Sequence, residues 1–420
     1  MPDSARPRFD VGSTRSNRLP LYTGFLLTGV VTVLLGPLLP ELSREWSLPV
    51  GNLAPLFVAQ FLGSAVGSLL SSYRQGLSLA IGYLLITVGL SSLAMASWPI
   101  ALAPVAAIGL GLGLAIPATN LRVAHSQPTR RGAALSSLNL VWGAGAVACP
   151  LAFAVRPPGM SSDAVLLVLA GAAGLVLSCL AWNVRPAAAG RFTLGAPASS
   201  PAVAAGLLTR GRHAPQGGDS VPSGRQGGVM PGLVVIAAIL FLYVGIENAV
   251  GGWLVSLADQ FQPTRSATSL WIGSGFWAAL LAGRLVAPLL LRRMSERVLY
   301  GTGLAVAGAG LLGLLTSGSQ LGVAVSAVAV GAGLAPLFPL TVSFLAELTA
   351  STQSRSTGWV FALAGTGGAV LPWLTARLAG GAEQLAAGFI APIAGLTLLA
   401  LLFGFLNRLA TLTAPPRARP

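Results

Sequence analysis

The stretch GLVVIAAILFLYVGIENAVGGWL, residues 232–254, determines the class of fold. It carries a single charged side chain, that of Glu247. A bilayer core of about 30 Å is crossed by about 20 apolar residues in a helix, so the stretch predicts a membrane-spanning helix. The apolar run is continuous rather than alternating, which excludes a strand of a membrane β-barrel.

Eleven further stretches of similar length have little or no charge in their interiors. The first is too long for the apolar region of a cleaved signal peptide and is followed by more spans, so we expect it to stay in the membrane. The twelve predicted spans are 20–40, 52–72, 76–97, 101–121, 133–153, 163–183, 232–254, 269–291, 299–317, 320–343, 357–377 and 386–406. The fold class predicted is an all-α membrane protein.

The composition agrees with this class and excludes several others. Of the 420 residues 54% are hydrophobic and 9% are charged, against about 25% charged in an average soluble protein. The net charge of +14 comes from 25 basic side chains, all Arg, and 11 acidic ones. These Arg residues lie between apolar runs, unlike the basic patches of nucleic-acid binders, so we expect no nucleic-acid partner. Cys149 and Cys179 lie in apolar segments and predict no disulfide framework.

A long polar segment divides the spans into six and six. Residues 185–228 are rich in Gly, Ala, Ser, Pro and Arg and have no periodic apolar face, as in a flexible linker. We predict five regions: an N-terminal tail (1–19), a six-helix bundle (20–184), a linker (185–230), a second six-helix bundle (231–407) and a C-terminal tail (408–420).

Two glycine motifs recur between the halves. Gly111-Leu112-Gly113-Leu114-Ala115 matches Gly331-Ala332-Gly333-Leu334-Ala335, which aligns Gly111 with Gly331. Gly143-Ala144-Gly145 with Pro150 matches Gly365-Thr366-Gly367 with Pro372, which aligns Gly143 with Gly365. A parallel duplication of this kind relates the two halves of many transporters.

The Arg distribution predicts the orientation. With both termini in the cytoplasm, nineteen Arg residues fall in cytoplasmic segments and four (Arg44, Arg156, Arg265, Arg377) fall outside. Positively charged loops are retained in the cytoplasm, so we expect a multi-pass protein of the cytoplasmic (inner) membrane with both termini inside.

The sequence contains no recognisable catalytic or metal-binding constellation. His125 and His213 are the two histidines, one at the end of a span and one in the linker, so we expect no metal site, no cofactor and no enzymatic activity. The repeated glycines inside apolar helices favour close helix packing over phosphate binding.

Glu247 is the acidic residue that lies well inside a span. A carboxylate at that depth is costly unless it is paired, protonated or in contact with water, so it marks a substrate or proton path. The alternative is that it caps a break in the helix, because Asn248, Gly251 and Gly252 suggest local unwinding. Counting residues places Arg284 at a different depth, about 8 Å from the cytoplasmic edge against about 22 Å for Glu247. We therefore expect Arg284 to act in conformational change rather than as the partner of Glu247.

Other side chains at useful depth complete the candidate path. Amide groups suit hydroxyl-rich ligands, and aromatic faces suit apolar ones, although helix packing explains each residue equally well. These candidates are Gln60, Asn139, Trp142, Tyr243, Trp277, Phe338 and Asn248.

The residues resemble the major facilitator superfamily, and within it the fucose-permease-like sugar transporters. The resemblance rests on residues 241–254 (FLYVGIENAVGGWL), on Gly36-Pro37-Leu38-Leu39-Pro40, on Phe276-Trp277 with Gly283-Arg284, and on Ala335-Pro336-Leu337-Phe338-Pro339, together with Asn120 and Asn139. It implies two pseudo-symmetric six-helix bundles and gating roles for Gly36, Pro40, Arg74, Asn120 and Arg284.

The sequence departs from that resemblance at two places. The loop near Arg74 keeps Gly67 and Gly76 but has no acidic residue, and the acidic positions of the first and fourth helices correspond to Gly36 and Ile116. Glu247 is then the internal carboxylate left to titrate.

We therefore predict a monomeric secondary transporter that moves a small organic solute by alternating access. A sugar as substrate and proton-coupled symport are open within this prediction, as is facilitated diffusion. The alternatives are an exporter of drugs or metabolites and, from another class, a non-transporting membrane sensor or scaffold.

Overall fold

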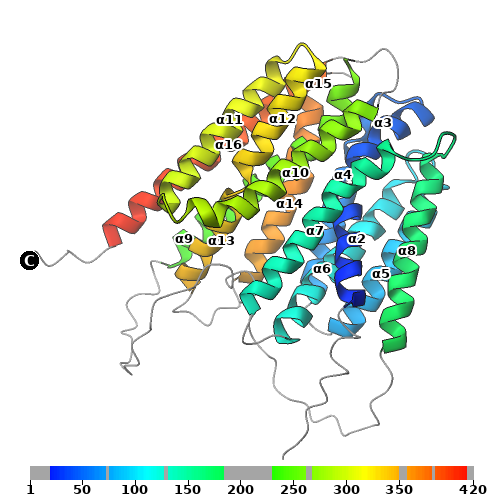
Figure 1. Ribbon diagram of the computed structural model, residues 1–420, viewed down its shortest axis with the longest axis horizontal. Helices are drawn as coiled ribbons and strands as arrows, with labels where there is room; N and C mark the ends of the chain where they lie inside the picture. The colour runs from blue at the N-terminus through cyan, green and yellow to red at the C-terminus, as the bar shows by residue number, and fades with distance from the viewer. Residues whose placement is uncertain are drawn as a thin grey trace, which may run out of the picture.

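The fold is described from a computed structural model, which places residues 19–71, 75–126, 131–183, 229–261, 267–349, 357–380 and 384–413. Within these ranges the regular elements are all helical, and no strand occurs. Figure 1 shows the helices running alongside one another, with the blue-to-teal elements of the first half on the right and the green-to-red elements of the second half on the left.

The first half contains six spans, of which the first is broken. The helices are α2 (Leu19–Thr32), α3 (Leu35–Glu45), α4 (Pro55–Leu70), α5 (Gln75–Leu93), α6 (Leu102–Ser126), α7 (Arg131–Ala154) and α8 (Ser162–Asn183), with a short 3-10 turn, η1 (Val50–Leu53), before α4. The axes of α2 and α3 differ by 46°, so together they form one bent span.

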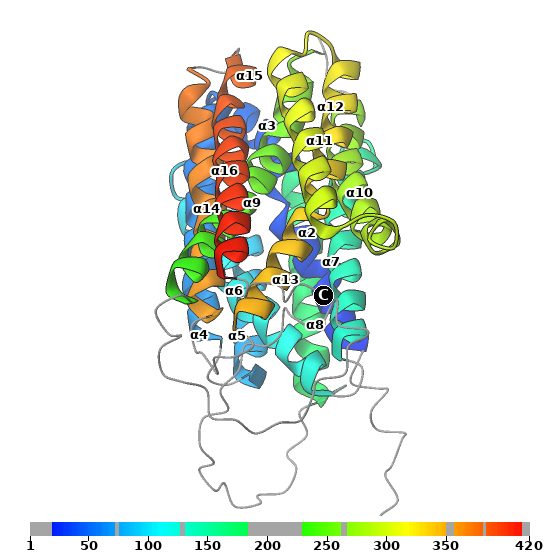
Figure 2. The ribbon, with the colours of Figure 1, turned by 90° about the vertical axis from the view of Figure 1, so that its left-hand side faces the viewer.

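The second half repeats this arrangement, with the breaks in its fourth and sixth spans. The helices are α9 (Val229–Asp259), α10 (Ala267–Leu290), α11 (Glu296–Thr316), α12 (Gln320–Leu334), α13 (Leu337–Thr349), α14 (Thr357–Leu378), α15 (Leu385–Gly388) and α16 (Ile390–Thr413). Figure 2 shows α13 following α12 toward the lower part of the bundle.

The predicted twelve spans correspond to these helices. Eleven helical stretches among the described residues are long and apolar enough to cross a membrane, and the bent pair α2 and α3 is the twelfth. The first span is longer than predicted because the chain continues as helix to Glu45 beyond the break at Val33 and Leu34. The tails and the linker fall largely outside the described residues, so their predicted boundaries stay predictions.

The two halves meet through equivalent helices. The second span of each half packs against the fifth of the other, which pairs α4 with α14 and α10 with α7. In addition α3 packs against α9, whereas α2 packs against α6, α7 and α8 of its own half. The spans alternate in direction, so Leu19, Asn183 and Val229 lie on one side of the bundle, which we call the linker side; the other is the far side.

Glycine contacts confirm the duplication and correct its register. A Cβ on Gly109 would meet Gln60 of α4, and one on Gly331 would meet Phe276 of α10, the equivalent helix. Gly111 likewise approaches Gly82 of α5, as Gly333 approaches Gly303 of α11. The equivalent pairs are therefore Gly109 with Gly331 and Gly111 with Gly333.

The predicted alignment of Gly111 with Gly331 is therefore wrong, because the glycines of this motif alternate with other residues and match in more than one register. The predicted alignment of the second motif has the register that the glycine contacts indicate. Gly145 lies against Leu26 of the first span and Gly367 against Phe241 of the seventh, two equivalent helices. Both repeats serve close helix packing.

Candidate functional site

The break in the first span is fixed by Pro37 and by an amide from the second span. Pro37 has no N–H to donate to the carbonyl of Val33, and the N–H of Gly36 takes that carbonyl instead at 3.1 Å. The carbonyl of Thr32 accepts a hydrogen bond of 2.8 Å from Nε2 of Gln60, which is buried. Gln60 therefore stabilises the break, in agreement with the helix-bonding alternative for this residue.

The break in the tenth span positions Phe338. Helix α12 ends at Leu334, Ala335 and Pro336 follow, and α13 begins at Leu337. A Cβ on Gly283 of α10 would lie 2.5 Å from Cβ of Ala335, so the glycine lets α10 approach this break closely. Arg284 is the residue after Gly283, and Phe338 lies three residues after Ala335. The close contact therefore brings Arg284 and Phe338 together.

The seventh span is not unwound. Helix α9 is continuous from Val229 to Asp259, so the local unwinding expected at Gly251 and Gly252 is wrong. A Cβ on Gly251 would lie 2.5 Å from Cζ2 of Trp277, and one on Gly252 would meet the ring of Phe57. These glycines serve close packing, and Glu247 does not cap a helix break.

Glu247 forms an ion pair with Arg284. Nη2 of Arg284 lies 3.2 Å from Oε1 of Glu247, and the two side chains are 19% and 9% exposed respectively. The same nitrogen donates to the hydroxyl of Tyr243 at 3.0 Å. Tyr243 and Glu247 are one helical turn apart on α9, so α9 presents both oxygens to one side chain of α10.

The expectation that the depths of Arg284 and Glu247 exclude an ion pair is therefore wrong. Helix α9 has 31 residues and is about 46 Å long, more than the bilayer core of about 30 Å, so its two ends cannot both lie at the membrane edges. Glu247 lies twelve residues from Asp259, the far-side end of α9, and Arg284 lies seventeen residues from Ala267, the far-side end of α10. The difference of five residues is about 7 Å, which the long Arg side chain spans.

Phe338 packs beside the ion pair, and two tryptophans meet farther along α10. The ring of Phe338 has its centroid 5.9 Å from Cζ of Arg284 and 5.4 Å from the ring of Tyr243. Farther along α10, Trp277 meets Trp142 of α7 edge to face, with ring centroids 6.2 Å apart. The pair of tryptophans connects the two halves.

The halves touch just beyond the ion pair, on the far side. A Cβ on Gly36 of α3 would lie 2.7 Å from the carbonyl oxygen of Gly251, one turn beyond Glu247. The rings of Phe57 and Trp253 lie 5.3 Å apart, and Nε1 of Trp253 donates to the carbonyl of Pro372 at 2.9 Å. We call the set Gly36, Phe57, Gly251, Gly252 and Trp253 the far-side seal.

The remaining candidates lie apart from the ion pair or bond within their own helices. Nδ2 of Asn248 donates to Val244 and Nδ2 of Asn120 to Ile116, both one turn earlier. Asn139 is exposed on α7, and Pro40 is half-buried in α3. Arg74 lies outside the described residues.

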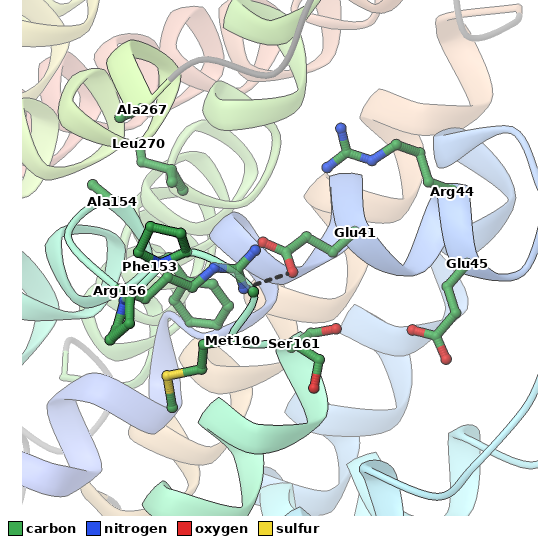
Figure 3. A pocket seen from close by; sticks show the side chains of 14 residues that line it. Glu41, Arg44, Glu45, Phe153, Ala154, Arg156, Met160, Ser161, Ala267 and Leu270 are labelled. Carbon is green, nitrogen blue, oxygen red and sulfur yellow. Dashed lines mark hydrogen bonds and ion pairs between the residues drawn. The ribbon is translucent and has the colours of Figure 1, made fainter.

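A second Glu–Arg pair, which the sequence did not single out, lies at the far side. Nη1 of Arg156 donates to Oε2 of Glu41 at 2.9 Å, and both side chains are largely buried. They line an open pocket of about 530 Å³ between α3, the segment after α7 and the start of α10 (Figure 3). Sequence alone gave little signal for this pair, because the partners are 115 residues apart.

The described residues contain no group of three or more His, Cys, Asp and Glu side chains that could hold a metal ion. Nδ1 of His125 lies 3.4 Å from Nε2 of Gln75, and His213 lies outside the described residues. The chemistry that the site around Glu247 offers is therefore that of an ion pair, a phenol and aromatic surface.

Comparison with known proteins gives matches in structure. No model of a protein family matches the chain, and no curated protein matches its sequence. A bacterial homologue of the human lysosomal transporter Spinster, in an inward-facing and unoccupied conformation, superimposes with a TM-score of 0.70 at 12% identity, covering 98% of this chain and 100% of the other.

The fucose:proton symporter FucP of E. coli is also similar. A variant of it superimposes with a TM-score of 0.57 at 16% identity, over 92% of this chain and 97% of the symporter. A structure of FucP in the outward conformation, described as a major facilitator superfamily transporter, gives 0.56 over the same shares. The chain therefore has the fold of the major facilitator superfamily transporters.

Proposed function

We propose that the chain is a secondary transporter that carries a small organic solute across the cytoplasmic membrane by alternating access. The observation that carries the proposal is the Glu247–Arg284 pair, placed between the far-side seal and the linker side. Buried charges at this depth are costly and mark substrate or ion paths. A bundle built for stability alone has no need of them.

The contacts between the halves support an inward-facing state. The far-side seal closes the path beyond Glu247, and Oγ of Ser274 in α10 donates to the carbonyl of Val147 in α7 at 3.1 Å. These contacts between the halves lie on the far side of the ion pair, as expected when the far side is closed. With the Arg-rich linker in the cytoplasm, this arrangement faces inward.

The site consists of Glu247, Arg284, Tyr243 and Phe338, with Trp277 and Trp142 as the aromatic wall next to the seal. Solute binding between the halves and rocking of the halves about this site would move it across. Gly36 and Pro40 act in this proposal through the bent first span, which carries one face of the seal. The protein works as a monomer, because one chain supplies both halves of the path.

The test is solute counterflow in proteoliposomes. Sugars, organic acids and drugs are first screened by thermal shift on the purified protein, because a ligand that prefers the folded state raises its apparent stability. Each solute that stabilises the protein is then assayed for exchange. We expect exchange by the wild type and loss of exchange in Arg284→Gln.

The matched control is Arg156→Gln, which removes the guanidinium of the other Glu–Arg pair. We expect this variant to retain exchange, because Arg156 lies on the far side of the seal. Folded protein that exchanges none of the stabilising solutes, or equal loss in both variants, would contradict the proposal.

A further inference from the structure

The guanidinium of Arg284 is bonded through one of its three nitrogens. Both of its hydrogen bonds come from Nη2, one to Tyr243 and one to Glu247. Its Nε is buried and has no hydrogen-bond partner among the described residues. A guanidinium carries five N–H donors in a planar fork, and Nε shares one edge with Nη2, so this edge has one bonded nitrogen and one unpaired donor.

The edge formed by Nε and Nη2 matches a carboxylate once Glu247 releases Nη2. Two parallel N–H groups bind the two oxygens of a carboxylate together, and leaving a buried donor unpaired costs its desolvation. The Arg284 side chain is 19% exposed, and the ring of Phe338, with its centroid 5.9 Å from Cζ of Arg284, offers apolar surface beside it. A ligand with a carboxylate and an apolar body therefore fits the site.

The site is less suited to binding a sugar. Nε2 of Gln60 is bonded to the carbonyl of Thr32, and Nδ2 of Asn248 is bonded to Val244 of its own helix. Hydroxyl-rich ligands need several free donors and acceptors, and these two amides already use donors on backbone carbonyls.

We infer that the solute is a small organic carboxylate whose carboxylate binds Arg284 in place of Glu247, and that one proton moves with it. This inference rests on the proposed function. The Glu247–Arg284 pair is neutral, so an added carboxylate leaves one uncompensated negative charge in the bundle. One proton from the aqueous phase adds to an oxygen of Glu247 and restores neutrality, because a buried unpaired carboxylate is costly.

The charged surroundings of Glu247 are consistent with one proton. The ionisable side chains that act on it are Arg284 and Tyr243. Helix α9 itself carries Asp259 at its far-side end. Helix α12, which packs against α9, carries no charged side chain among its described residues. Apart from α10, the other helices packed against α9 carry charged side chains near their ends. These are Glu41, Arg44 and Glu45 on α3, Glu347 on α13, Arg377 on α14 and Arg408 on α16.

The test uses four carboxylates and their neutral amides on the purified full chain. Acetate, lactate, succinate and benzoate are each compared with the corresponding amide by thermal shift. Proton uptake is read with a pH indicator in weakly buffered solution. We expect at least one carboxylate to raise the melting temperature while its amide does not, with about one proton taken up per carboxylate bound.

Three variants separate binding from protonation. Arg284→Lys keeps a positive charge for Glu247 but loses the planar fork, so binding should weaken about ten-fold or more. Arg284→Gln should abolish binding, and Glu247→Gln should bind the carboxylate without proton uptake. The melting temperature of each unliganded variant shows whether it is folded. If Arg284→Gln and Glu247→Gln do not fold, Arg284→Lys alone tests the binding of the carboxylate.

The inference is overturned if the amides stabilise the protein as well as the acids do. It is overturned equally if none of the four carboxylates binds, or if binding is unchanged in folded Arg284→Lys. Counterflow of a neutral solute would then leave the transport proposal standing without the carboxylate. Absence of exchange for every stabilising solute would instead remove the transport proposal itself.

Discussion

Gly36→Ala is expected to open the far-side seal. The added methyl group would lie 2.7 Å from the carbonyl oxygen of Gly251, which belongs to the backbone of α9 and cannot rotate away. Overpacking of this kind costs about 1–3 kcal/mol, less about 0.5–1 kcal/mol that Ala gains over Gly within a helix. A net cost of about 1–2 kcal/mol borne by the closed seal shifts the population about 5- to 30-fold toward the outward-open state.

The matched control is Gly365→Ala in α14, where a Cβ meets nothing within 4 Å. It shares the gain in helix propensity but adds no clash. Distances are measured by double electron–electron resonance with spin labels at Met95 and Gly318 on the far side, and at Ser126 and Arg293 on the linker side. Cys149 and Cys179, neither of which forms a disulfide, are replaced by Ala beforehand.

In Gly36→Ala we expect the far-side distance to lengthen and the linker-side distance to shorten, while Gly365→Ala matches the wild type. If the distributions of Gly36→Ala superimpose on those of the wild type, the contact between α3 and α9 does not gate the path.

Three further predictions concern single contacts. Gln60→Ala leaves the carbonyl of Thr32 unpaired and should lower the free energy of unfolding by about 1–3 kcal/mol, read as a lower melting temperature; an unchanged value would show that another group takes over that bond. Trp253→Phe keeps the ring next to Phe57 but loses the bond to Pro372, and should cost about 1 kcal/mol by the same measurement, with a loss above about 3 kcal/mol contradicting this reading. Tyr243→Phe removes one acceptor from Nη2 of Arg284 and should leave Glu247 as its sole partner there; solute affinity should change while the free energy of unfolding falls by no more than about 1.5 kcal/mol, and unchanged affinity would exclude Tyr243 from the site.

The spans could be predicted from sequence because the bilayer imposes their length. Continuous apolar runs of about 20 residues identify helices without knowledge of their neighbours, and α7, α8 and α10 begin and end within two residues of the predicted spans. The breaks were harder to place, because Pro37 and Pro336 interrupt helices that then continue to Glu45 and Thr349.

The candidate site was predicted in part. Glu247 could be recognised because a carboxylate inside an apolar run is costly wherever it faces. Its partner could not, because the depth estimate assumed that each span starts at the membrane edge, and α9 is longer than the bilayer core. The tertiary roles of Gln60 and Gly251 depend on groups of other helices, which carry no sequence signal.

The proposed role of Glu247 as the proton carrier is tested most directly by uptake into proteoliposomes under an imposed pH gradient. The solute is one shown to exchange in counterflow, and wild type is compared with Glu247→Gln. We predict that the wild type accumulates the solute on the alkaline side, whereas Glu247→Gln exchanges solute without gradient-driven accumulation. Undiminished accumulation in Glu247→Gln would contradict the coupling of solute and proton through the Glu247–Arg284 pair.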